Sequence, residues 1–185
     1  MMTQTPEENM QEFRNSVGMT VTLISFGMMF ASLFLGYFLV RFNAPVWPPV
    51  EIENLPKLLP FLSTLVMGIS SYTYYKFEKG EERKKFWIIT FLLGMAFLGL
   101  QYSLWNALAA SGILVANGNV PSMVYAFTWI HAVHIVVALG LVLWLGYYVF
   151  RKPSGLTKAK LINVGKFWHF LGVVWLMMYL MLFVL

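Results

Sequence analysis

Five long apolar stretches constrain this chain more than any other feature of its sequence. They cover about residues 17–40, 58–75, 86–110, 122–150 and 167–185. About 20 apolar residues in a helix cross the hydrocarbon core of a bilayer. Backbone groups in lipid must be satisfied within the segment, and the stretches lack barrel-like alternation, so each is expected to be a helix. The sequence predicts an all-α integral membrane protein: a polar tail over residues 1–16, then one domain of five transmembrane helices over residues 17–185.

The composition of the chain agrees with a lipid environment. Hydrophobic residues make up 59% of the 185 residues, charged residues make up 11%, and there is no cysteine. Soluble domains are about 45–50% apolar and about 25% charged. The lack of cysteine excludes disulfides, thiolate nucleophiles, iron–sulfur clusters and cysteine-ligated zinc or copper.

The positions of the 13 Lys and Arg residues predict the orientation of the chain. When they are assigned to the tails and loops between the five stretches, eleven fall on one side and two on the other. Positive loops mark the cytoplasmic side, so the N-terminus and the tail are expected in the cytoplasm and the C-terminus outside. The basic loops could also hold anionic lipid head groups. Orientation alone explains the net charge of +5, and no nucleic-acid partner is expected.

The five stretches contain no charged residue. All eight acidic residues are Glu, and they lie with every Lys and Arg in tails or loops. Ionisable groups inside a bilayer are costly and typically mark proton relays or ion paths. The sequence therefore predicts no catalytic residue, and it argues against a proton pump, a proton-coupled transporter or an intramembrane protease working through this chain alone.

Three histidines are the exception to this uncharged interior. His131 and His134 are spaced i, i+3 and share one helix face, whereas His169 lies near the start of the last stretch. The helical rise separates His131 and His169 in depth by more than about 10 Å, so one metal ion cannot bind both. The residues predict no metal site. Haem or metal ligation remains an alternative to neutral imidazoles that form hydrogen bonds in the bundle or hold a lipid.

Several aromatic residues fall near the ends of the expected spans. Aromatic side chains at span ends typically anchor a helix at the membrane border. This position predicts an anchoring role for Trp47, Trp87, Tyr147, Tyr148 and Trp168.

Four short patterns, in order along the chain, resemble subunit III of the haem–copper oxidases, the cytochrome c and quinol oxidases. They correspond to that family's WPP, LNT…SS, HGxHV and WHFVDxVWL segments. In this chain they read Trp47-Pro48-Pro49, Leu62-Ser63-Thr64 with Ser70-Ser71, His131-Ala132-Val133-His134, and Trp168-His169-Phe170 with Val173-Val174-Trp175-Leu176; the pair Leu100-Gln101 also falls in place. The resemblance covers nearly the whole chain from about Val17, and the family includes a five-helix form with a cytoplasmic N-terminus.

The resemblance implies a non-catalytic subunit of a respiratory terminal oxidase in the bacterial inner (cytoplasmic) membrane. Its expected partners are subunit I, the other oxidase subunits and membrane lipids. It is expected to stabilise the catalytic subunit and to hold phospholipid during oxygen reduction in aerobic electron transport. Haem and copper are expected in partner subunits and no cofactor in this chain. By resemblance, the candidates for lipid contact or packing are His131, His134, His169, Trp47, Trp168 and Arg151.

The chain departs from the family at three intramembrane acidic positions. Phe26, Leu104 and Gly172 stand where carboxylates are usual. No role in proton uptake is therefore expected of this chain, whereas scaffolding and lipid retention do not require those acids.

Other functions stay open at this stage. An accessory or assembly protein of a nitric oxide reductase-type complex is the main alternative, because short members of the family occur there. A small transporter or channel is disfavoured by the odd number of helices and the uncharged interior. A membrane cytochrome would show a haem Soret band in the isolated subunit.

Overall fold

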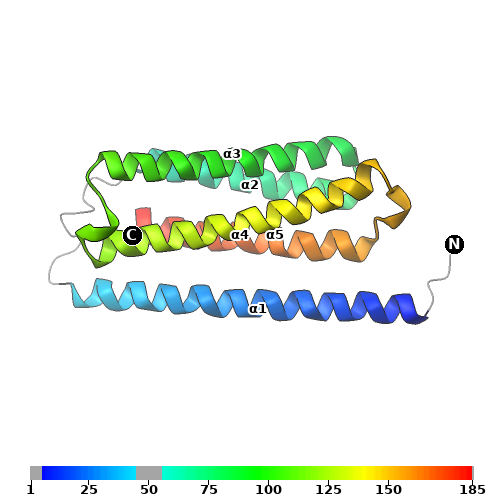
Figure 1. Ribbon diagram of the computed structural model, residues 1–185, viewed down its shortest axis with the longest axis horizontal. Coiled ribbons are helices and arrows are strands. Elements are labelled where there is room, and N and C mark those ends of the chain that lie inside the picture. Colours follow the sequence, from blue (N-terminus) through cyan, green and yellow to red (C-terminus); the bar gives the residue numbers. More distant parts are fainter. Residues whose placement is uncertain (1–5, 45–55, 185) are drawn as a thin grey trace.

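The computed structural model describes residues 6–44 and 56–184, and the structure in these ranges is helical. The long helices are α1 (Pro6–Asn43), α2 (Leu58–Lys79), α3 (Arg83–Ala110), α4 (Asn119–Phe150) and α5 (Lys158–Tyr179), with short turns η2 (Val115–Asn117), η3 (Pro153–Gly155) and η4 (Leu180–Val184). Figure 1 shows the long helices side by side in an elongated bundle, with the start of α1 and the end of α5 at opposite ends. The predicted all-α, five-helix fold is confirmed.

Four of the helices, α1, α3, α4 and α5, are long and apolar enough to cross a membrane. The remaining helix, α2, has 22 residues, which span about 33 Å and match the thickness of a bilayer core. Its lower hydropathy comes from hydroxyl residues, and two of these form hydrogen bonds within the helix. Ser63 donates to the Leu59 carbonyl and Thr64 to the Pro60 carbonyl, both at 2.9 Å.

Two helices begin well before their apolar stretches. Helix α1 already begins at Pro6, within the polar N-terminal segment, because proline is well suited to a first helical turn. Helix α5 begins at Lys158, nine residues before the stretch that starts at Phe167, and the Thr157 side chain caps it by accepting from the Lys160 amide. Apolar composition marks the part of a helix that avoids water, whereas the helix itself continues to its cap.

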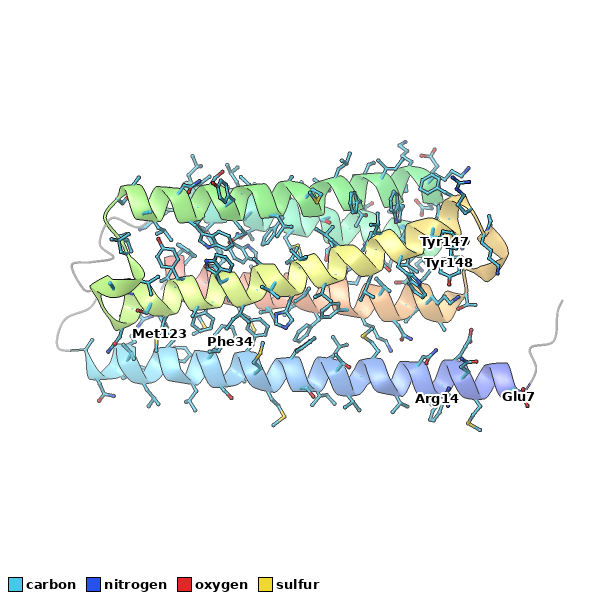
Figure 2. All side chains as sticks on the ribbon, in the orientation of Figure 1. Glu7, Arg14, Phe34, Met123, Tyr147 and Tyr148 are labelled. Atoms are coloured by element: carbon cyan, nitrogen blue, oxygen red, sulfur yellow. The ribbon has the colours of Figure 1, made fainter. Side chains whose placement is uncertain are left out.

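The connections place the basic loops at one end of the bundle. In Figure 1 the α2–α3 and α4–α5 connections lie at the end where α1 begins. Figure 2 shows that Arg14 of α1 and Tyr147 and Tyr148 of α4 lie toward this same end. Gly80, in the left-handed region at φ 92°, ends α2 there. This clustering of the basic loops beside the start of α1 agrees with the orientation that the charge count predicts.

Helix α1 packs along one side of the other helices through aromatic side chains. Phe34 stacks on Phe127 of α4 at 5.3 Å between ring centroids, and Figure 2 shows Phe34 and Met123 at this junction. About one turn further along α1, the Tyr37 hydroxyl donates to the Met181 carbonyl at 2.9 Å. These contacts fix α1 against α4 and against η4, which directly follows α5.

Hydrogen bonds between side chains and neighbouring helices join the remaining four. The Thr73 and Thr90 hydroxyls pair at 2.9 Å between α2 and α3. The Trp87 indole donates to the Val142 carbonyl of α4 at 2.7 Å. The Trp175 indole of α5 donates to a hydroxyl of α2 at 3.1 Å. Each bond satisfies a donor that lipid cannot satisfy.

Candidate functional site

His131 lies where four helices meet. Its side chain is fully buried, and its ring centroid is 6.3 Å from that of Phe30, 5.8 Å from Phe97 and 5.5 Å from Trp175. These rings come from α1, α3 and α5, while His131 belongs to α4. A side chain without exposed surface cannot touch lipid, so the position of His131 is that of a packing residue.

His134 is one turn further along α4 but has different surroundings. Its Nδ1 lies 2.7 Å from the Ile130 carbonyl oxygen. Because a carbonyl only accepts, Nδ1 donates this bond. The ring meets the edge of Phe26 at 4.5 Å and Phe30 at 5.7 Å. The two histidines therefore share one aromatic neighbour, but only His131 lies in the bundle centre.

Phe26 stands where the resemblance described above leads us to expect a carboxylate. Besides the ring of His134, it contacts Phe167 of α5 at 5.8 Å between centroids. An acid at this site would lie beside an imidazole, whereas the phenyl ring joins α1 to α4 and α5 through apolar contact. The second such position, Leu104, is fully buried in the core.

The third acidic position, Gly172, lines a groove between α2 and α5. The groove has a volume of about 290 Å³ and is lined by Thr64, Met67, Gly68, Ser71, His169, Gly172, Val173, Trp175 and Leu176. His169 Nδ1 lies 2.8 Å from Ser71 Oγ. A Cβ atom on Gly172 would meet Ser71 Oγ at 3.4 Å and Met67 Cγ at 3.8 Å. Because Gly172 has no Cβ atom, the groove stays open at this point, and Gly68 and Gly172 both line it.

The Ser71–His169 pair lacks what a hydrolytic site needs. Both residues lie well inside helices, α2 and α5. Backbone amides there are committed to i→i−4 hydrogen bonds and cannot form an oxyanion hole. The pair can join two helices, and it can offer a hydrogen bond to a molecule in the groove.

Trp168 does not anchor the membrane border, and this corrects the sequence-based expectation. The residue is fully buried, and its ring stacks on that of Tyr74 at 6.4 Å. The reason is the early start of α5, which places Trp168 ten residues inside the helix.

Arg151, another candidate for lipid contact or packing, is exposed at the end of α4, where its amide donates to the Tyr147 carbonyl. Trp47 lies outside the described residues.

The three histidines are not brought together. Within residues 6–44 and 56–184, no three His, Asp or Glu side chains form a group that could hold a metal ion. His131 is enclosed by aromatic rings, the Nδ1 of His134 is bonded to a carbonyl, and His169 faces α2. Their arrangement is suited to packing, and His169 also forms a hydrogen bond to another helix.

Sequence reasoning missed the importance of Gln101. Its side chain is 1% exposed, and neither its amide nitrogen nor its amide oxygen has a hydrogen-bond partner among the described residues. The available signal was a strongly polar residue inside an apolar stretch. Asn106, on the same helix, gives the same signal but is exposed, so the sequence alone cannot single out Gln101.

Comparison with known proteins shows which family the chain resembles. The family profile described as cytochrome c oxidase subunit III matches residues 8–185. Cytochrome c oxidase subunit 3 of Thermostichus vulcanus is 28% identical, and the alignment covers 91% of this chain and 86% of that protein. A probable cytochrome c oxidase subunit 3 of Mycobacterium bovis is 33% identical with the same coverage. A probable quinol oxidase subunit 3 of Staphylococcus haemolyticus is 26% identical over 89% of this chain and 86% of its own length.

The match extends over nearly all of a chain that folds as a helical membrane bundle. It confirms the resemblance read from the four sequence patterns. The protein is a multi-pass membrane protein, and a subunit III of an oxidase is part of a hetero-oligomeric complex. The chain belongs to the cytochrome c oxidase subunit III family.

Proposed function

We propose that this chain is the non-catalytic subunit III of a haem–copper terminal oxidase in a bacterial cytoplasmic membrane, where it stabilises the catalytic subunit I. The observation that supports this most is the aromatic centre around His131, to which α1, α3, α4 and α5 all contribute. A bundle held by such contacts, with Phe26, Leu104 and Gly172 at the family's acidic positions, is suited to support a partner and not to carry protons. Haem and copper belong in this proposal to the partner subunits.

The α2–α5 groove is the proposed place for a lipid chain. Val173 and Leu176, which line it, are 58% and 46% exposed on the outside of the bundle. An acyl chain entering from the bilayer would meet apolar side chains and a glycine wall, with His169 and Ser71 as a polar patch on the lining. Filling the groove is expected to replace the lipid.

Deletion of this subunit from the native bacterium tests the scaffold proposal. We expect the remaining oxidase to keep its haem content and its initial rate of oxygen reduction but to lose activity sooner over repeated turnover. Immediate loss of turnover in a core with full haem content would contradict the proposal. Purification of the tagged chain, followed by mass spectrometry and a visible spectrum, identifies the partner and its haems and separates a terminal oxidase from a nitric oxide reductase-type complex.

A matched pair of variants tests the lipid proposal. Gly172→Leu places a side chain in the groove, whereas Gly99→Leu on α3 adds one where no atom lies within 4 Å of a Cβ. We expect native mass spectrometry of the complex to show fewer retained phospholipids for the first variant and an unchanged number for the second. Equal retention in both would place the lipid elsewhere.

A further inference from the structure

Two fully buried polar side chains face the bundle interior from neighbouring helices. Gln101 of α3 is 1% exposed and His131 of α4 is 0% exposed. Their four polar atoms, the two of the Gln101 amide and the two imidazole nitrogens, have no hydrogen-bond partner within the described ranges. Both residues lie in apolar helices, where no bulk water is at hand to satisfy them.

The register of α3 against α4 places these two residues at the same level. The Trp105 indole donates to the Thr128 hydroxyl at 3.0 Å, and a Cβ atom on Gly94 would meet Leu139. The two helices run antiparallel (Figure 1). Both pairs therefore imply that Gln101 lies opposite residues 131–132. Phe97, one turn before Gln101, touches the His131 ring, with 5.8 Å between ring centroids.

Among the described residues, the rings around His131 form no hydrogen bond with it. The rings of Phe30, Phe97 and Trp175 stand around the imidazole at 5.5–6.3 Å between centroids. Leu104, one turn beyond Gln101, is apolar and buried.

An unsatisfied buried polar group costs about 1–3 kcal/mol, and more than about 90% of such groups in native proteins have a partner. A neutral imidazole offers one donor and one acceptor, and a glutamine amide offers two donors and a carbonyl acceptor. A water molecule supplies both kinds and typically makes about three hydrogen bonds in a protein interior. A single water can therefore accept a hydrogen bond from one of the two side chains and donate one to the other.

We propose that Gln101 and His131 bind a buried water molecule between α3 and α4. The water accepts an N–H bond from the Gln101 amide and donates to the acceptor nitrogen of the imidazole. The nitrogen that accepts from the water carries no proton, so the water fixes the tautomer of the ring. Its hydrogen bonds also favour one register of α3 against α4, whose contact is otherwise apolar. The indole N–H of Trp168 is also buried without a partner among the described residues. It lies on α5 two turns before Trp175, so it is not part of this site.

Radiolytic labelling of the purified full complex in H2(18)O tests the proposal. Hydroxyl radicals formed from a bound water label the side chains beside it even when these are buried. We expect 18O incorporation at Phe97 and Trp175 several-fold above that at Phe77, an equally buried residue. Gln101→Leu should reduce this labelling to the level of Phe77.

Labelling of Phe97 and Trp175 no greater than that of Phe77, or labelling that persists in the Gln101→Leu variant, would overturn the proposal. If that variant does not assemble, the wild-type complex alone decides. A density map that resolves buried waters in the partner subunits should then show a peak between Gln101 and His131. A direct bond between the two side chains, or no peak at that resolution, would refute the water site.

Discussion

Substitution of Gly94 by alanine tests how closely α3, α4 and α5 approach one another. A Cβ atom at this buried position would lie 2.7 Å from Leu139 Cδ2 and 2.8 Å from Trp168 Cη2. Leu139 is 5% exposed and Trp168 0%, so neither side chain has free space to move into. Overpacking costs about 1–3 kcal/mol, and two close contacts with enclosed neighbours favour the upper part of that range. The gain in helix propensity is about 0.5–1 kcal/mol, which leaves an expected net loss of about 1–2 kcal/mol.

Gly99, on the same helix, provides the matched control. No atom lies within 4 Å of a Cβ placed there, so Gly99→Ala keeps the propensity gain without the clash. The free energy of unfolding of each purified variant is measured by titrating detergent micelles with SDS and following tryptophan fluorescence. A loss of about 1–2 kcal/mol corresponds to a roughly 5–30-fold larger unfolding constant for Gly94→Ala. Gly99→Ala is expected to match or exceed the wild type.

A double mutant identifies the physical cause. Leu139→Ala removes the nearest clashing atom, so its combination with Gly94→Ala should cost less than the sum of the two single variants. The relief is partial, because Trp168 still lies close to the new methyl group. If Gly94→Ala proves as harmless as Gly99→Ala, or if the two costs simply add, the close-packing argument is wrong.

Three further variants probe single contacts. Tyr37→Phe removes the hydroxyl that donates to the Met181 carbonyl and should lower the free energy of unfolding by about 1 kcal/mol; an unchanged value in the same titration would mean that the bond does not hold α1. Gly172→Ala places a Cβ at ordinary contact distances of 3.4–3.9 Å and should leave stability unchanged or slightly higher, while a clear loss would show that the groove is narrower than described. Ser71→Ala removes the partner of His169 Nδ1, so the 15N chemical shifts of that imidazole should change, and identical spectra would exclude the bond.

Several properties of this protein follow from the sequence because they depend on local composition. The length of each apolar stretch determines that a helix can span a bilayer, and the distribution of Lys and Arg predicts on which side each loop lies. The absence of charge from the stretches limits what the interior can do. The order of the four short patterns was sufficient to indicate the family, which the full-length match confirms.

The environment of each side chain required the tertiary structure. In a soluble helix the polar face marks the outside, but in a membrane the lipid-facing and the buried faces are both apolar, so hydrophobic periodicity does not separate them. This is why Gln101 and Asn106, both polar and both on α3, could not be distinguished until one proved buried and the other exposed. His131 and His134 share a helix face by spacing, yet only the packing of α1, α3 and α5 around them makes one a central packing residue and the other a contact of α1. Composition determines that a helix enters the membrane, and the neighbouring helices decide which of its residues meet protein and which meet lipid.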